Sequence, residues 1–230
     1  MKKIRCAAAL AALTLVMTAS VRAEGVPEFR VDPFWPKPLP NNWIFGEIGG
    51  IAVDRHDHVW VLQRPRSLTD DEKGAAVDPP TSKCCKPAPP VLEFDQSGNL
   101  LQAWGGPGSG FDWPQREHGI FVDARDHVWI GGNEKDDHQI LEFTRDGKFI
   151  KQIGESAKSE GSNSTRFLGR PALAIVDDAA HEVYVADGYG NKRVVVFDAR
   201  TGEYKRHWGA YGKAPDDADA GKYDPGAPRA

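Results

Sequence analysis

Three polar residues of this 230-residue chain stand where their side chains could act together on a ligand. His118 opens the stretch HGIFVDARDHVW, Arg64 follows Trp60 by four residues, and Tyr189 follows Tyr184 by five. An imidazole can bind a metal or move a proton, a guanidinium can hold a carboxylate, and a phenol can act as an acid or base. Whether the three meet depends on the elements that carry them.

The stretch that begins at His118 repeats an earlier one. GGIAVDRHDHVW begins at Gly49, so His118 occupies the place of Gly49. A second half follows each copy, as VLEFDQSGNLLQAWGG (91–106) and ILEFTRDGKFIKQIGE (140–155), and a third unit combines ALAIVDDAAHEVYVAD (172–187) with VVVFDARTGEYKRHWGA (194–210). The aligned positions are Trp60, Trp129 and Tyr184; Phe94, Phe143 and Phe197; and Gly105, Gly154 and Gly209.

Each repeat predicts four short strands. In the second unit they are GIFVD, VWIGG, QILEF and KFIKQIG, and the turns QSGN, RDGK and RTGE place glycine where a positive φ is needed. Four-stranded units that repeat along a chain are typical of β-propeller blades. We therefore predict an all-β fold, a β-propeller with three four-stranded blades at 49–106, 118–155 and 171–212. A β-sandwich with accidental internal similarity is the alternative.

The segments around the blades complete the predicted domain organisation. Residues 24–48 form a proline-rich leading segment, residues 64–90 form a surface insertion in the first blade, and residues 213–230 form a disordered tail or a linker. Three blades fall short of the four to eight that close a propeller. The chain is then either part of a longer protein, of six blades in the full form, or a half-ring that two chains close together.

The first 23 residues have the pattern of a secretory signal peptide. Lys2, Lys3 and Arg5 precede an apolar run at 7–19, which is too short to span a bilayer, and small residues near Ala23 offer a cleavage site. We predict a secreted or periplasmic protein without a stable membrane anchor. Cleavage would remove four basic residues and leave a net charge of about −8, which argues against nucleic acid as a partner.

Two adjacent cysteines, Cys84 and Cys85, remain after cleavage. A reduced pair, a vicinal disulfide and part of a metal site are all open interpretations. An oxidising compartment favours a bridge, and the absence of CxxC spacing disfavours a metal site.

Propeller topology predicts that the three polar residues share one face. Strands of a blade run up and down, so the start of an innermost strand and the end of a second strand lie at the same end. His118 precedes an innermost strand, and Arg64 and Tyr189 follow second strands. Channel mouths of this kind are usual ligand sites. Each residue also fits a structural role: a hydrogen-bonded histidine, a surface arginine before a proline, and a tyrosine that plugs the channel.

The units resemble NHL repeats, and residues 49–212 resemble three of the six blades of the peptidyl-α-hydroxyglycine α-amidating lyase family. GIAVDRHDHVWVLQR (50–64), HGI (118–120) and ADGYGNKRVVVF (186–197) carry the resemblance. It implies Arg64 and Tyr189 as catalytic residues and His118 as a zinc ligand. It also implies that the backbone carbonyls of Ile51 and Ile120 face a calcium ion.

The sequence also departs from the family pattern. Gly190 stands where the family has cysteine, and Gln63 stands where it has histidine. The family's other two zinc histidines and its second catalytic arginine belong to later blades, which this sequence does not contain. Catalytic zinc normally takes three protein ligands, and the resemblance supplies one.

Two functions follow from these observations. The first is a non-catalytic platform that binds a small molecule, a peptide or a protein partner. The second, implied by the resemblance, is zinc-dependent cleavage of a C–N bond that releases an amide and glyoxylate, with Zn2+ and Ca2+ as cofactors. In that reaction Tyr189 would be the general base and Arg64 would orient the substrate.

Overall fold

A computed structural model describes residues 27–218 and Gly226. The part from Phe34 onward forms one compact unit, and residues 27–33, which carry no strand, belong to another. The predicted signal peptide (1–23) lies outside the described residues. In the described part, no helix is long and apolar enough to cross a membrane.

Three four-stranded antiparallel sheets make up most of the larger unit. Blade one contains β2 (Glu47–Val53), β3 (Val59–Arg64), β5 (Val91–Phe94) and β6 (Leu100–Trp104). Blade two contains β7 (Glu117–Val122), β8 (Val128–Gly132), β9 (Gln139–Phe143) and β10 (Phe149–Gly154). Blade three contains β11 (Leu173–Asp177), β12 (Glu182–Asp187), β13 (Arg193–Asp198) and β14 (Tyr204–Trp208). The all-β prediction and its three blades are confirmed.

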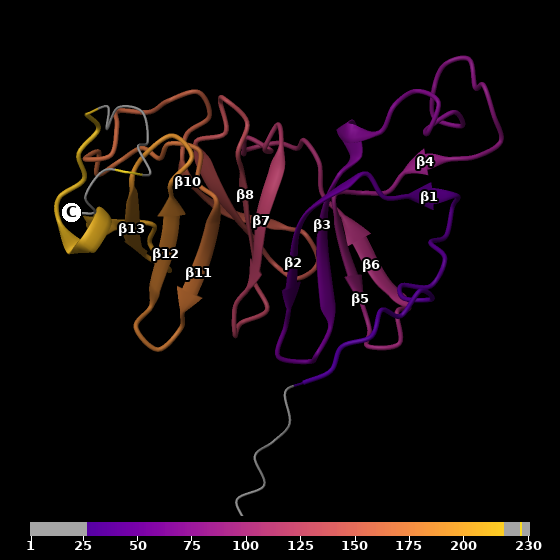
Figure 1. Cartoon of the computed structure of the whole chain (residues 1–230), viewed down its shortest axis with the longest axis horizontal. Coiled ribbons are helices and arrows are strands. Elements are labelled where there is room, and N and C mark those ends of the chain that lie inside the picture. Colours follow the sequence, from indigo (N-terminus) through magenta and orange to yellow (C-terminus); the bar gives the residue numbers. More distant parts are fainter. Residues whose placement is uncertain (1–26, 219–225, 227–230) are drawn as a thin grey trace, which may run out of the picture. The chain divides into compact units, whose positions relative to one another are not determined.

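The blades stand side by side in chain order (Figure 1), and β7 contacts both β2 and β11. The first strand of each sheet is therefore the innermost, as propeller geometry requires. Smaller elements lie outside the blades: β1 (Trp43–Ile44) pairs in parallel with β4 (Lys86–Pro87), and η1 (Pro65–Ser67) and η2 (Ala210–Gly212) are single 3-10 turns.

The repeated Asp and Trp residues fix the inner hairpins of blades one and two. In blade two, the Asp123 carboxylate accepts hydrogen bonds from the backbone N–H groups of Arg125 and His127, both at 2.9 Å, and from the indole of Trp129 at 3.1 Å. Asp54 makes the equivalent bonds in blade one. One carboxylate thus closes the turn and anchors the buried tryptophan.

Apolar layers between neighbouring blades form the core. Ile120 and Val122 of β7 pack with Trp60 and Leu62 of blade one, and blade three packs in the same way on Trp129. Both tryptophans are essentially inaccessible to solvent. Burial of a side chain of this size contributes several kcal/mol, so the blades stabilise one another.

A glycine in the innermost strands permits this close packing. A Cβ on Gly50 would lie 2.9 Å from the carbonyl oxygen of His118, and a Cβ on Gly119 would overlap the carbonyl oxygen of Ala172. The shared glycine of GGI and HGI therefore serves the contact with the next blade.

The flanking segments are partly packed. Cys84 and Cys85 are joined as a vicinal disulfide in the insertion of blade one. In the segment predicted to be a disordered tail or a linker, Asp217 accepts a hydrogen bond of 2.8 Å from the backbone N–H of Ser162. Most of that segment beyond residue 218 lies outside the described residues.

Candidate functional site

His118 and Tyr189 meet at one end of the blades. The phenol oxygen of Tyr189 lies 2.8 Å from Nε2 of His118, and the two rings contact edge to face with centroids 5.0 Å apart. His118 lies on β7 of blade two, and Tyr189 follows β12 of blade three. Tyr189 is 48% exposed and His118 is half-buried. The pair bridges two blades and remains open to a ligand.

A backbone carbonyl orients the imidazole. Nδ1 of His118 lies 3.1 Å from the carbonyl oxygen of Ala172, which can only accept a hydrogen bond. In the neutral ring Nδ1 therefore carries the proton, and Nε2 accepts from the Tyr189 hydroxyl. The Nε2 lone pair is thus engaged by Tyr189, and the phenol oxygen, which can still accept a hydrogen bond, is the group that this pair presents to a ligand.

The loop that carries Tyr189 is held from beneath. Asp187 accepts hydrogen bonds from Gly169 N at 2.7 Å, Asn191 Nδ2 at 2.7 Å and Arg193 Nε at 2.9 Å. A Cβ on Gly190 would lie 2.7 Å from the carbonyl oxygen of Gly169, so this loop has no room for the cysteine of the lyase pattern. Asp187, Asn191 and Arg193 of the DGYGNKR motif thus fix the loop that presents Tyr189 to solvent.

Arg64 lies at the same end, but its guanidinium is already engaged. Its Nε donates to the carbonyl oxygen of Glu117 at 2.7 Å, and Nη1 pairs with Glu47 at 2.7 Å. It lines a polar hollow of about 270 Å³ together with Arg66 and Arg116. Of the three residues predicted to meet, His118 and Tyr189 are in direct contact. Arg64 instead contacts Glu117, the residue that precedes His118.

The groups beside the pair have shifted acidities. Burial raises the pKa of Glu117, which opposes the effect of the hydrogen bond it accepts from the indole of Trp113. The hydrogen bond from Arg64 lowers the pKa of Glu47. Burial lowers the pKa of His138, and its Nδ1 accepts a hydrogen bond from the backbone N–H of Arg170 at 3.1 Å. His138 thus acts as a structural acceptor.

Arg170 connects this neighbourhood to the site. Its guanidinium carbon lies 5.8 Å from the centre of the Tyr189 ring, and its side chain donates to the carbonyl oxygen of Asn133. A cation over the ring face stabilises the phenol and adds positive charge near the mouth. The sequence interpretation did not identify Arg170, which lies in a loop without a repeat counterpart.

A zinc site is not assembled around His118 by the described residues. A zinc site needs at least three potential ligand residues within reach of one ion. In the part that the structure describes, His118 belongs to no such group. The groups that do occur lie elsewhere: Asp54, His58 and Glu93 in blade one, and Asp123, His127 and Glu142 in blade two.

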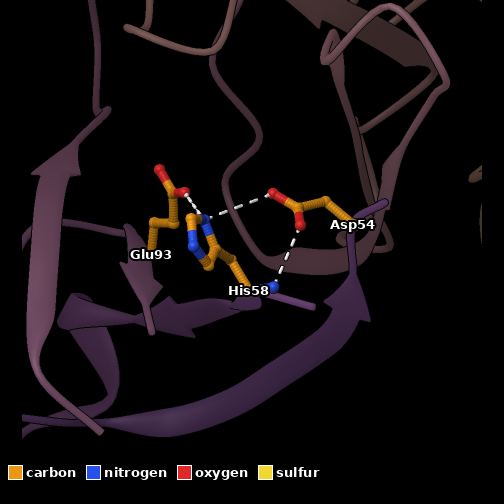
Figure 2. A group of neighbouring side chains, drawn as sticks. All are labelled: Asp54, His58 and Glu93. Atoms are coloured by element: carbon orange, nitrogen blue, oxygen red, sulfur yellow. Dashed lines mark hydrogen bonds and ion pairs between the residues drawn. The ribbon is translucent and has the colours of Figure 1, made fainter. Parts of the chain in front are cut away.

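Figure 2 shows the group in blade one, where His58 Nδ1 lies 2.7 Å from Glu93. Arg145 of blade two reaches into this group and pairs with Glu93 and Asp54. The Arg145 guanidinium thus balances the negative charge of these two carboxylates. The contact also joins blade two to blade one. His58 and His127 are both partly buried, and each is paired with a buried glutamate.

Ile51 and Ile120, the predicted calcium-facing residues, occupy adjacent innermost strands. Ile51 lies on β2 opposite Val61, and Ile120 lies on β7 opposite Ile130. The backbone of the two strands is close, because a Cβ on Gly50 would lie 3.3 Å from the nitrogen of Ile120. The role of their carbonyls toward calcium stays a prediction.

The fold and its repeats define the chain as a β-propeller, and its similarity to a curated NHL repeat-containing protein supports the NHL type. The chain is 30% identical over 178 residues to NHL repeat-containing protein 3 of Mus musculus, covering 74% of this chain and 43% of that protein. It thus spans less than half the length of the curated relative it matches. No family model matches the chain.

Solved structures give more distant likenesses. Hydrazine synthase of Kuenenia stuttgartiensis matches with a TM-score of 0.45 and 11% identity, over 74% of this chain and 38% of that one. A gluconolactonase of Xanthomonas campestris matches with a TM-score of 0.37 and 14% identity, over 64% of this chain and 36% of that one.

Proposed function

We propose that these blades form a ligand-binding platform whose site is the mouth lined by His118, Tyr189 and Arg64. The observation that carries the proposal is the 2.8 Å contact between Tyr189 and His118. It joins two blades, and both side chains remain partly exposed to solvent. A phenol oxygen held by an imidazole, with guanidinium groups nearby, suits a small polar ligand that carries a hydroxyl and a carboxylate.

Binding of N-acetyl-α-hydroxyglycine, measured by titration calorimetry, tests this proposal. Tyr189→Phe removes one hydrogen-bonding group and should raise the dissociation constant about 3–10-fold, the effect of one hydrogen bond. His118→Ala should weaken binding at least as much, because it removes the acceptor and frees the phenol. Tyr211→Phe is the matched control, since Tyr211 is 94% exposed and lies outside the site. Unchanged affinity in both site variants would reject this site.

A second candidate is the lyase activity that the sequence resemblance implies. It is favoured by the Tyr189 phenol, which lies within hydrogen-bonding distance of an oriented imidazole beside Arg170. His118 would supply one zinc ligand, and the carbonyls of Ile51 and Ile120 would face calcium. Stoichiometric zinc and calcium by elemental analysis, with glyoxylate released from the same probe, would support this candidate. Binding without either metal and without glyoxylate would leave the platform alone.

We further propose that the protein acts outside the cytoplasm, after cleavage of the signal peptide. The expected mature protein begins at Glu24, and its Cys84–Cys85 pair is oxidised. N-terminal sequencing of the exported protein and thiol titration check both points. An intact Met1 in the exported fraction would contradict the cleavage.

A further inference from the structure

The vicinal disulfide lies on the surface, where the insertion of blade one returns to its sheet. The insertion leaves β3 through η1 and comes back through β4 to β5. Cys84 and Cys85 are bonded to each other directly before β4. Cys84 is exposed and Cys85 is half-buried. The bridge is therefore open to a reagent in solution.

Backbone hydrogen bonds attach the chain at the bridge and beside it. The N–H of Ala75, in the outgoing half of the insertion, donates to the carbonyl oxygen of Cys85 at 3.3 Å. The N–H of Lys86, the next residue, donates to the carbonyl oxygen of Asn42 at 2.9 Å. The conformation of the bridged pair thus positions a contact within the insertion and a contact with the leading segment.

The pairing of β4 with β1, which follows the bridge, is short. It consists of two residue pairs, Trp43 with Lys86 and Ile44 with Pro87. Pro87 has no N–H to donate, so the next bond comes from the N–H of Ala88, which donates to the carbonyl oxygen of Ile44 at 3.0 Å. Parallel pairing of this length is weak, and segments with few hydrogen bonds open first.

A buried glutamine fastens the chain after β4. Gln63 is inaccessible to solvent, and its Nε2 donates to the carbonyl oxygen of Ala88 at 2.7 Å. Its backbone N–H donates to the carbonyl oxygen of Pro90 at 2.8 Å, and its Oε1 accepts from the backbone N–H of Gly46 at 2.8 Å. A movement that starts at the bridge therefore ends at this anchor. We call residues 84–87 the return segment.

We propose that the Cys84–Cys85 bridge is a thiol-exchange site, which a dithiol reductant opens reversibly in the folded protein. Solvent-exposed bridges are the labile ones among protein disulfides. Opening releases the return segment from Ala75 and Asn42, while Gln63 keeps the chain from Ala88 onward in place. The reagent is defined by its chemistry, a pair of thiols that can close a ring on each other.

The exchange balances in two steps. A thiolate of the reductant attacks the sulfur of Cys84 and forms a mixed disulfide, and the sulfur of Cys85 leaves as a thiolate that takes up a proton. The second thiolate of the reductant then attacks the reductant's own sulfur in the mixed disulfide, and the sulfur of Cys84 leaves and takes up a proton. Two electrons pass to the bridge, two thiols form on the protein, and the reductant becomes a cyclic disulfide.

Amide hydrogen exchange of the full chain, followed by NMR with and without excess dithiothreitol, tests the proposal. Reduction should speed exchange at Ala75 and Lys86 at least ~10-fold, because the backbone around Cys85 can turn once the two side chains rotate apart. The amide of Gln63, which is bonded to Pro90, should keep its rate in both states. Thiol titration should count two further thiols after reduction, and oxidised glutathione should restore slow exchange. Circular dichroism checks that the reduced protein is folded.

Two variants separate the bridge from other effects of the reductant. Cys84→Ser combined with Cys85→Ser removes the bridge, so exchange at Lys86 should be fast with and without dithiothreitol. Cys6→Ser is the matched control, because Cys6 is the only other cysteine of the chain. Its response to the reductant should equal that of the parent protein.

The proposal would be overturned by a bridge that stays intact in excess dithiothreitol, or by equal exchange at Ala75 and Lys86 in both redox states. Loss of the fold on reduction would overturn it as well, since the bridge would then be part of the structural core. Slow exchange at Lys86 in the double-serine variant would have the same consequence, because the return segment would hold its place without the bridge.

Discussion

Replacing Asp187 with alanine is expected to lower the free energy of unfolding by about 3–5 kcal/mol, the cost of breaking a buried ion pair from one side. Both side chains of the Asp187–Arg193 pair are fully buried, with 2.9 Å between Nε and Oδ2. The substitution removes the charge that balances a guanidinium which water cannot reach.

Arg193 cannot relieve the loss by moving to the surface, because its other nitrogens are held. They donate to the carbonyl oxygens of Ser162, Ser164 and Phe167. Asp187 also supports Gly169 and Asn191 beneath the Tyr189 loop, so the variant should weaken ligand binding as well as stability. Urea denaturation followed by tryptophan fluorescence measures the change.

Arg55→Met is the control for this prediction. Arg55 pairs with Asp126 at 2.8 Å, but its side chain is 56% exposed, so its removal should leave the urea unfolding midpoint close to that of the parent protein. If Asp187→Ala cost no more than this surface variant, the buried pair would not be the support of the loop.

The blades could be predicted from the sequence because their repeat is local. Each turn uses residues close in the chain, such as Asp123 with His127 and Trp129, so the aligned letters carry the geometry. The meeting of His118 and Tyr189 was also predictable, since the direction of each strand decides the end at which its flanking residues lie. Arg64 was placed at the correct end, but its bonds to Glu47 and Glu117 depend on side-chain packing that no pattern reveals.

The charged groups inside the blades were missed although the sequence holds a signal for them. Glu93 and Glu142 interrupt otherwise apolar strands at the same repeat position, and His58 and His127 precede the two tryptophans at the same distance. Blade three changes both positions together, to Val196 and Glu182. A repeated charge in a buried strand requires a partner, so the paired change pointed to a contact between them.

The proton position on His118 could not have been predicted. It depends on the carbonyl of Ala172, a backbone group of another blade that no side-chain pattern records. That carbonyl is positioned by the close approach of β7 and β11, and the approach depends on Gly119.

Gly119→Ala should therefore reduce both stability and binding. A Cβ at this position would overlap the carbonyl oxygen of Ala172 and lie 3.1 Å from the Cα of Leu173. Both are backbone atoms, so blade three must shift as a unit. We expect a loss of about 1–3 kcal/mol in unfolding free energy, as for overpacked sites. The shift should also weaken the Nδ1 hydrogen bond of His118, which histidine nitrogen chemical shifts report directly.

Gly188→Ala separates this effect from the general cost of replacing a glycine. A Cβ on Gly188 meets no atom within 4 Å, although it lies next to Tyr189. Its unfolding free energy should stay within about 0.5 kcal/mol of the parent, with the His118 signals unchanged. Equal behaviour of the two variants would mean that β7 and β11 can separate freely. The Ala172 carbonyl would then no longer hold the proton on Nδ1 of His118, and the geometric basis for a ligand site at this mouth would be lost.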